Sequence, residues 1–238
     1  MANFRIIPRL EIKSKSLIKG MRMEGLKKFD NLFKRIDNYQ KDNADEFFYD
    51  DIVASLYSRE IDFNFVKRIA NLINIPLTVG GGVRALKDIE KLFNVGADKI
   101  SINSALFNRP KLLEQASIRF GSQSILIQAQ TKKINNQYYV FYNSGREYSQ
   151  ILLNDWIKRT IDLGVGEIAI ISIDFDGMTN GVDIQLLNYA DLYNVSFLYG
   201  GGVVNKEDIN ILKKFNFQGA LISAALHKNF TTVKKLKK

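Results

Sequence analysis

Two glycine triplets, residues 80–82 and 200–202, carry the clearest chemical signal in this 238-residue sequence. Each triplet follows a short apolar run that is typical of a buried strand. Backbone N–H groups without neighbouring side chains can approach an anion closely, so such triplets suit the binding of a phosphate group. The alternative is that the glycines only form tight turns. Small residues open the next predicted helix in both copies, SINSAL from Ser101 and LISAAL from Leu221, and they favour phosphate binding.

The triplets belong to a longer repeat that keeps a single register. Asp88 recurs as Asp208, and Ala105 recurs as Ala225, each after 120 residues with no gap. A chance glycine cluster would not keep its downstream helix and strand in step, so the repeat indicates two similar halves, about 1–120 and 121–238. It predicts two phosphate sites on opposite sides of one mouth, and hence a long substrate with a phosphate at each end. The predicted phosphate-binding residues are Gly81, Gly82, Asn103, Ser104, Gly201, Gly202, Ser223 and Ala224.

The elements that must position these glycines alternate between strands and helices. Eight short β-branched or aromatic runs are predicted as strands, separated by patterns of helical period. This alternation is typical of a parallel sheet, and two equal halves predict one α/β domain over residues 1–238, a (β/α)8 TIM barrel built from duplicated half-barrels. An open doubly wound sheet is the alternative. The predicted strands are 5–12, 46–51, 76–80, 99–103, 124–130, 167–172, 196–200 and 219–223.

One segment interrupts the alternation of strands and helices. Residues 131–145 alternate apolar and polar side chains around Asn135 and Asn136, a pair typical of a two-residue hairpin turn. We therefore expect a small hairpin insertion after the fifth strand. The loops that follow the strands of such a barrel carry its chemistry, so the hairpin is expected beside the site.

The composition restricts the chemistry further. The chain has no cysteine and one histidine, His227, so thiolate chemistry is excluded, and no metal site or other cofactor is expected. The formal net charge of +9 comes from lysines spread over many polar faces, which favours anionic small substrates over nucleic acid. No apolar run approaches the ~20 residues of a membrane span, and the start lacks a signal-peptide core. We expect a cytoplasmic protein without membrane insertion.

Several segments resemble the cyclase subunit of imidazole glycerol phosphate synthase, the HisF family. They are TVGGGVRALKDIEKLFNVGADKISINSALF, IDFDGMTNGVD, RIIPRLEIK and FGSQSILIQ, and they span nearly the whole chain in the family's order. The resemblance implies a glutaminase partner, HisH-like, at the N-terminal face of the barrel. Ammonia from that partner would pass through the barrel to the opposite mouth and attack a bisphosphorylated ribulosyl aminoimidazole. It also implies that Gly177 contacts a phosphate.

Two positions depart from the family's catalytic pattern. The resemblance implies two aspartates as acid and base, and their positions here hold Glu11 and Gln130. Glu11 keeps a titratable carboxylate on a longer side chain, whereas the amide of Gln130 cannot exchange a proton at physiological pH. The family's small polar residue on the sixth strand is replaced by Ile171. The family's cyclisation therefore loses one of its two proton-transfer groups.

Other family positions are retained in type. The resemblance implies an ammonia gate of four charges at strand starts, and such charges are costly to bury unless they compensate one another. Ordinary ion pairs are the alternative. The resemblance also implies that Asp98 contacts the glutaminase. His227 is expected to begin a helix rather than to act in catalysis. The gate residues are Arg5, Glu46, Lys99 and Glu167, and the implied substrate-binding residues are Lys19, Asp51, Ser144, Gly145, Asp174 and Asp176.

Three functions follow from these features. The favoured one is an ammonia-accepting synthase subunit of a glutamine amidotransferase, a divergent paralogue in surface-polysaccharide biosynthesis, where acetamido sugars are amidinated. The second is a genuine histidine-biosynthesis cyclase of reduced activity that uses Glu11 alone. The third is a non-catalytic subunit that activates its glutaminase. The acceptor, the individual partner and the oligomeric state do not follow from the sequence.

Overall fold

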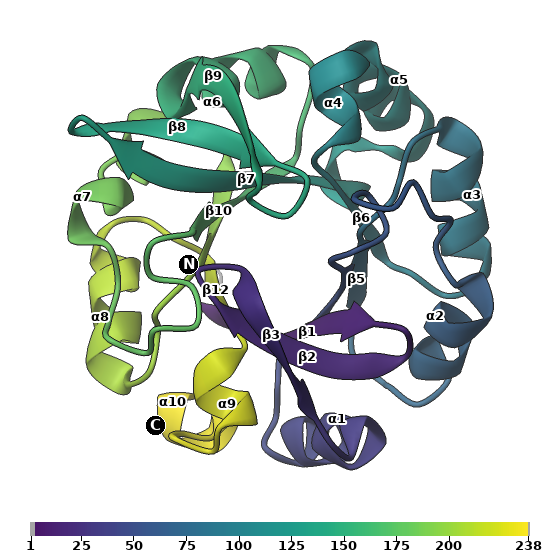
Figure 1. Ribbon diagram of the computed structural model, residues 1–238, viewed down its shortest axis with the longest axis vertical. Helices are drawn as coiled ribbons and strands as arrows, with labels where there is room; N and C mark the ends of the chain where they lie inside the picture. The colour runs from purple at the N-terminus through teal and green to yellow at the C-terminus, as the bar shows by residue number, and fades with distance from the viewer. Residues whose placement is uncertain (1–2, 238) are drawn as a thin grey trace.

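Eight parallel strands close into a barrel in the computed structural model, which describes residues 3–237 (Figure 1). Strand β1 pairs with β4 and with β12, and the pairing of β7 with β10 completes the circle. The predicted (β/α)8 barrel and its eight strands are confirmed, while residues 1, 2 and 238 of the predicted domain lie outside the described residues. The barrel strands are β1 Arg5–Lys13, β4 Phe47–Asp51, β5 Leu77–Gly80, β6 Lys99–Ile102, β7 Ile125–Ile134, β10 Glu167–Ser172, β11 Ser196–Gly200 and β12 Gly219–Ile222.

Helices form an outer layer around the barrel (Figure 1). The two helices after the glycine triplets start in the same way. Asp88 accepts hydrogen bonds from two backbone N–H groups at the start of α3, at 3.0 and 2.9 Å, and Asp208 accepts the corresponding pair at α8, at 2.8 and 3.2 Å. Helix ends leave backbone N–H groups unpaired, so this bond explains why the aspartate recurs. The helices are α1 Leu32–Lys41, α2 Phe63–Ala70, α3 Leu86–Asn94, α4 Ala105–Asn108, α5 Lys111–Phe120, α6 Leu153–Asp162, α7 Ile184–Leu187, α8 Lys206–Lys214, α9 Ala224–His227 and α10 Val233–Lys237.

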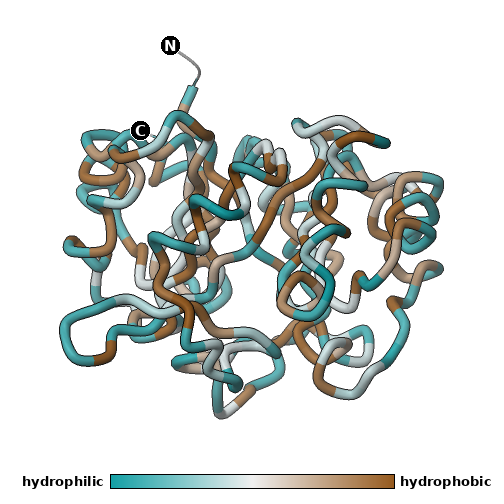
Figure 2. The backbone as a smooth tube through the Cα atoms, turned by 90° about the horizontal axis from the view of Figure 1, so that it is seen from above, coloured by the Kyte–Doolittle hydropathy of each residue, from teal (hydrophilic) through white to brown (hydrophobic). Residues whose placement is uncertain are grey.

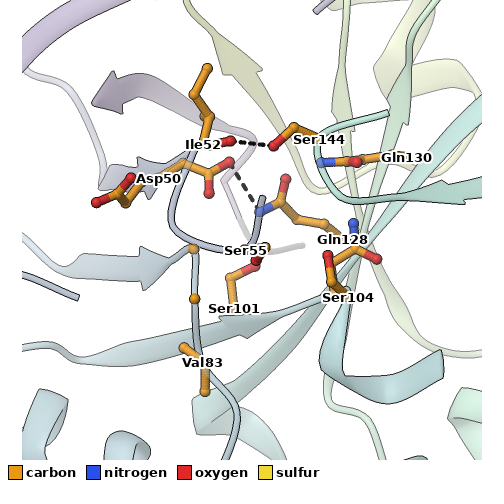
Figure 3. A pocket seen from close by; sticks show the side chains of 13 residues that line it. Asp50, Ile52, Ser55, Val83, Ser101, Ser104, Gln128, Gln130 and Ser144 are labelled. Atoms are coloured by element: carbon orange, nitrogen blue, oxygen red, sulfur yellow. Dashed lines mark hydrogen bonds between the residues drawn. The ribbon is translucent and has the colours of Figure 1, made fainter. Parts of the chain in front are cut away.

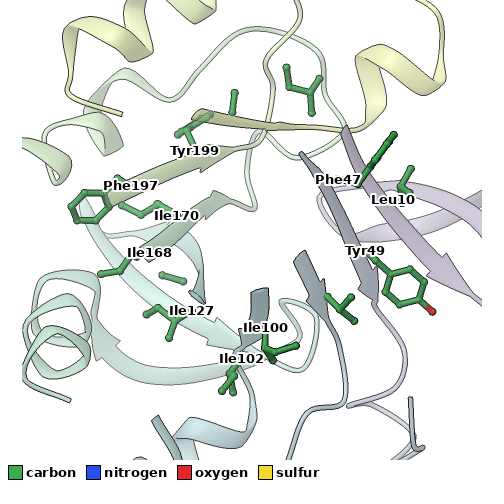
Figure 4. Packing of buried hydrophobic residues seen from close by; sticks show 14 of the residues in the cluster. Leu10, Phe47, Tyr49, Ile100, Ile102, Ile127, Ile168, Ile170, Phe197 and Tyr199 are labelled. Atoms are coloured by element: carbon green, nitrogen blue, oxygen red, sulfur yellow. The ribbon is translucent and has the colours of Figure 1, made fainter. Parts of the chain in front are cut away.

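The apolar core has two parts because side chains alternate across each strand. Outward-facing residues such as Phe47, Tyr49 and Ile168 pack between the barrel and its helices (Figure 4). Hydropathy along the chain follows this arrangement, with apolar stretches running through the interior (Figure 2). A smaller cluster fills the barrel itself. Its members are Ile7, Phe48, Leu126, Ala169, Ile171, Leu198 and Leu221.

Two antiparallel extensions project from the barrel strands. Strands β2 Ser16–Met21 and β3 Glu24–Phe29 continue β1 as a meander that the sequence analysis missed, because EGLKKF in β3 lacks the apolar character of a buried strand. The second follows β7, through β8 Gln137–Tyr142 and β9 Glu147–Leu152. Asn135 and Asn136 both have positive φ, as a tight turn between these strands requires. The insertion therefore reaches Leu152, rather than ending near residue 145.

Candidate functional site

A small polar cavity of about 30 Å³ lies where β4, β5, β6 and β7 end (Figure 3). It combines residues predicted for phosphate binding with others predicted for catalysis and substrate binding. Asp50, Ser101 and Gln128 also line it, although the sequence analysis assigned them no role. The predicted site residues that line the cavity are Asp51, Gly81, Gly82, Asn103, Ser104, Gln130 and Ser144.

Several polar atoms of this cavity have no partner within the described protein. The hydroxyl of Ser101 is buried without a hydrogen bond, and so are both side-chain polar atoms of Asn103. Buried polar groups are normally paired, so unpaired ones lining a cavity can bind a ligand. The Ser104 hydroxyl is engaged, because it accepts a 3.0 Å hydrogen bond from the backbone N–H of Asn143. This bond fastens the β8–β9 loop to the start of α4.

Both glycine triplets need the conformational freedom of glycine. Gly82 has φ 78°, and a Cβ atom there would lie 2.8 Å from Ala54 Cβ. Gly202 has φ 82°, and a Cβ atom there would lie 1.9 Å from the backbone oxygen of Gly181. L-residues rarely adopt such φ values, so both turns require glycine. The turns are therefore explained without a ligand, and phosphate binding remains a prediction.

The helices α4 and α9 that follow the small-residue segments have four residues each. Such short helices contribute little dipole, so phosphate binding at either triplet would depend on the individual backbone N–H groups. At the second triplet, Ser223 and Ala224 lie at the start of α9, and Gly202 accepts a backbone hydrogen bond from Gly181 at 3.2 Å. Gly177, which is also predicted to contact a phosphate, lies close to Gly181 in sequence. Its carbonyl oxygen accepts a hydrogen bond from Lys228 Nζ at 3.2 Å.

Glu11, Lys19 and Asp176 form a buried charge network beside the cavity. Lys19 Nζ lies 2.8 and 2.7 Å from the two Glu11 oxygens, and 2.7 Å from Asp176 Oδ2. All three side chains are buried. Burial raises the pKa of Glu11 above its usual range, although the cations of Lys19 and Arg9 oppose the shift. Glu11 can therefore take up a proton at a higher pH than an ordinary carboxylate.

Gln130 holds the neighbouring loop. Its Oε1 accepts a 2.8 Å hydrogen bond from the backbone N–H of Gly145. Ser144, next in the same loop, donates a hydrogen bond to the backbone oxygen of Ile52. These contacts bring Gln130, Ser144 and Gly145 together at the mouth, beside the Glu11 network. The amide at position 130 thus has a positioning contact but no group that titrates at physiological pH.

A second buried network crosses the barrel, and the sequence analysis missed it. Arg9 donates to Asp50 at 2.6 Å and to Gln128 at 3.1 Å, and Gln128 donates to Asp50 at 3.2 Å. Arg9 is on β1 and Gln128 is on β7, on opposite sides of the closed barrel. Burial alone would lower the pKa of Arg9, but the carboxylates of Glu11 and Asp50 raise it, so the cation is stable.

The two-residue period of a strand offered a signal for these residues. Arg9 lies two positions before Glu11, and Gln128 lies two positions before Gln130, so each pair shares the inner face of its strand. Asp50 likewise shares the inner face of β4 with Phe48. The two-residue period of the sequence therefore indicates which polar residues occupy inner positions of the buried strands.

The remaining predicted residues lie in several places. Asp51 pairs with Arg59 at 2.8 Å, and burial raises its pKa although Arg59 opposes the shift. Asp174 accepts a 3.0 Å bond from the backbone N–H of Lys133, which gives it a structural contact. Ile171 belongs to the apolar cluster inside the barrel. His227 ends α9 rather than beginning a helix, which corrects the expectation for this residue.

The four predicted gate residues form a closed ring at the opposite end of the barrel. Arg5 pairs with Glu46 at 3.0 Å and with Glu167, while Lys99 lies 3.4 Å from Glu46 and 3.0 Å from Glu167. Burial would raise the pKa of Glu167, but hydrogen bonding and charge from Arg5, with Lys99, lower it. The carboxylate therefore stays ionised, and the charges compensate one another.

Asp98 lies at the N-terminal end of β6. Its Oδ2 accepts a 2.8 Å hydrogen bond from the backbone N–H of Leu77, so it has a structural contact within the chain.

No helix among residues 3–237 is long and apolar enough to cross a membrane. Within the same residues, no three His, Asp or Glu side chains are grouped to hold a metal ion.

Known proteins are similar to this chain in sequence over almost its whole length. Residues 5–232 match the family described as histidine biosynthesis protein. Imidazole glycerol phosphate synthase subunit HisF of Natranaerobius thermophilus is 39% identical over 98% of this chain and 94% of its own. The HisF subunit of Sulfolobus acidocaldarius is 37% identical over 100% of this chain and 96% of its own. The HisF protein of Legionella pneumophila is 37% identical over 88% of this chain and 100% of its own. The chain belongs to the histidine biosynthesis protein family, and within it to the HisF cyclase subunits.

Proposed function

We propose that this protein is the ammonia-accepting subunit of a glutamine amidotransferase, with the glutaminase at the N-terminal end of the barrel. The observation that carries the proposal is the closed ring of Arg5, Glu46, Lys99 and Glu167. Four charges that satisfy one another at one end of the barrel, opposite a polar cavity, suit a controlled entrance and a reaction site. A phosphate-bearing substrate would bind at the cavity end, between the two glycine triplets.

The reaction differs from the histidine-pathway cyclisation in this proposal. Position 130 carries an amide that is bound to Gly145, so only Glu11 remains to transfer protons between the two expected sites. An acceptor that needs one titratable group fits this arrangement better. The acceptor reaction we favour is amidination of an acetamido sugar for a surface polysaccharide, in which ammonia forms a bond to the amide carbon, the carbon–oxygen bond breaks and the oxygen leaves as water. The names of the relatives supply the alternative, a genuine cyclase of imidazole glycerol phosphate synthase.

A third candidate has a specific observation in its favour. The apolar cluster and the bridge from Arg9 to Gln128 lie between the ring and the cavity, and Arg9 is 2% exposed. Such a filled barrel suits a non-catalytic subunit that only activates its glutaminase. In that case ammonia would leave the complex without reaching the cavity.

Turnover of the bisphosphorylated ribulosyl aminoimidazole with ammonium salts tests the reaction. General acid or base catalysis contributes about 10²- to 10⁴-fold, so we expect the protein to be slower than a HisF relative by at least about 10²-fold. The double variant Glu11→Asp/Gln130→Asp should gain activity, whereas Gln130→Asn should not. A wild-type rate equal to that of the relatives would establish the cyclase instead. Amidine formation from acetamido sugars, followed by mass spectrometry with the glutaminase present, tests the favoured acceptor.

The variant Lys99→Ala tests the entrance. It removes one of the two cations that hold Glu46 and Glu167, so ammonia produced by a bound glutaminase should partition more to solvent. Bisphosphate affinity at the opposite end should stay unchanged. The exposed Lys41→Ala serves as the control, because its partner Asp37 is also exposed. Unchanged ammonia partitioning, with lost bisphosphate binding, would mean that the four charges are ordinary structural pairs.

A further inference from the structure

A larger pocket, of about 360 Å³, continues outward from the small cavity at the first glycine triplet. Ser55, Val83 and Ser104 line both spaces, so the two adjoin each other. We call this space the outer pocket. Its volume falls in the range of ordinary small-molecule sites, whereas the inner cavity of about 30 Å³ has room for little more than one water. Any bulky part of a ligand at this triplet therefore belongs outside.

The charges around the triplet also favour a ligand in the outer pocket. Asp50 and Asp51 line the inner cavity, and no carboxylate is among the described residues that line the outer pocket. The outer pocket is instead lined by two arginines, Arg84 and Arg109. Arg84 is held in place by the backbone oxygens of Ser58, Ala54 and Arg59 at 3.0–3.2 Å. Both carboxylates of the inner cavity are already paired, Asp50 with Arg9 and Asp51 with Arg59. The cations of Arg84 and Arg109 therefore attract an anionic group to the outer side of the triplet.

An aromatic stack ends at the outer pocket. Trp156 and Phe107 are parallel within 5° with ring centroids 4.4 Å apart, and Phe107 stacks on Tyr142 with centroids 4.6 Å apart. Tyr142 is the member of this stack that lines the pocket, and it is half-buried. The buried Trp156 and the partly buried Phe107 fix the position of the tyrosine. A rigid aromatic ring beside two guanidinium groups suits a ligand that has a flat ring attached to phosphates.

We propose that the outer pocket binds the nucleoside diphosphate end of the substrate. The diphosphate lies between the first glycine triplet and the arginines, and the base contacts Tyr142. The proposal rests on the phosphate-bearing substrate of the proposed function and names its class. A substrate that ends in a simple phosphate at this triplet would leave Tyr142 and Arg109 without a ligand contact, although Tyr142 stacks on Phe107 and Arg109 donates to the backbone oxygen of Arg84 at 3.1 Å.

Binding of uridine diphosphate, adenosine diphosphate and inorganic pyrophosphate to the full chain, measured by calorimetry, tests the proposal. Stacking of a base on an aromatic ring is worth about tenfold in affinity, so both nucleotides should bind about tenfold more tightly than pyrophosphate. Tyr142→Ala should remove this difference, and Tyr142→Phe should keep it. Arg109→Ala should weaken all three ligands several-fold.

Two controls separate binding in the outer pocket from general effects. Tyr148→Ala changes an exposed tyrosine of β9 outside the pocket, and Arg119→Ala changes an exposed arginine of α5. Both should bind as the wild type does. Equal affinity for nucleotides and pyrophosphate, or equal effects of Tyr142→Ala and Tyr148→Ala, would overturn the proposal. If ribulose bisphosphate binds while nucleotides do not, only this proposal fails, and if neither binds, the phosphate-bearing substrate fails with it.

Discussion

The two glycine triplets have the same kind of backbone turn but differ in their surroundings. On the two neighbouring strands, Gly80 is in register with Asp50 and Ser101, whereas Gly200 is in register with Ile171 and Leu221. A Cβ atom at Gly80 would lie 3.4 Å from Asp50 Oδ1, and one at Gly200 would lie 2.6 Å from Ile171 Cδ1. The first triplet therefore faces polar groups and the second faces the apolar cluster.

This difference teaches that the repeat preserves structure rather than chemistry. The recurring aspartates at positions 88 and 208 bind the same backbone groups in both copies. The polar neighbour, by contrast, is not repeated, because Asp50 of β4 lies beside Gly80 whereas Ile171 of β10 lies beside Gly200. We therefore expect substitutions to separate the two regions by the kind of effect they cause.

The largest expected effect is on Arg9. Arg9→Leu leaves Asp50 and Glu11 buried with one cation fewer, and breaking a buried ion pair costs about 3–5 kcal/mol. The free energy of unfolding from urea titrations should fall by this amount. Removing the opposite charge as well, in Arg9→Leu/Asp50→Leu, should recover part of the loss. The exposed pair of Arg119 and Glu90 gives the comparison, because Arg119→Leu should cost at most about 1 kcal/mol. A loss below this value for Arg9→Leu would mean that the network contributes little.

The second contrast is in how stability depends on pH, because the second half of the chain contains a buried neutral histidine. His227 Nε2 lies 3.1 Å from the carbonyl oxygen of Arg9, to which it must donate, so Nδ1 accepts from the Tyr39 hydroxyl at 2.9 Å. Burial lowers the pKa of His227 to about 3, with smaller contributions from Lys19 and Arg35. The unfolded chain takes up this proton near pH 6.5, so the stabilisation is complete above that pH and is lost as the pH falls toward 3.

Urea unfolding at several pH values measures the titration of His227. The free energy of unfolding should fall by about 1.4 kcal/mol per pH unit below pH ~6.5, before ordinary carboxylates contribute. The chain has a single histidine, so His227→Gln should flatten the curve between pH 7 and 5. The same slope in the variant would show that another group titrates.

The smallest expected effect compares the starts of the two repeated helices. Asn205 caps α8 by accepting a 2.9 Å hydrogen bond from the backbone N–H of Asp208, while Ala85 has the same extended backbone before α3 but no such group. Asn205→Ala should cost about 1 kcal/mol of unfolding free energy, and Ala85→Asn should gain a similar amount. If the two changes do not have opposite signs, the two helix starts are less alike than their backbones indicate.

Much of the fold and part of the site followed from local patterns. Alternating strands and helices predicted the closed barrel, and the resemblance to the HisF family predicted four charged residues that do meet in one ring. The β2–β3 meander did not follow, since Glu24–Phe29 is polar and is held mainly by its pairing with β2. His227 was placed at a helix start because the sequence does not reveal that α9 is four residues long.

The sequence by itself determined the order of the strands, the two glycine turns and the presence of an amide at position 130, because each depends on residue type and short-range spacing. Only the tertiary structure decided that Arg9 reaches Asp50 and Gln128, residues 41 and 119 positions away along the chain. It also decided that Arg109 and Tyr142 line one pocket with Val83, the residue that follows the first triplet. Closure of the barrel brings distant strands across one small interior, and the partners of a side chain there depend on which strands face each other.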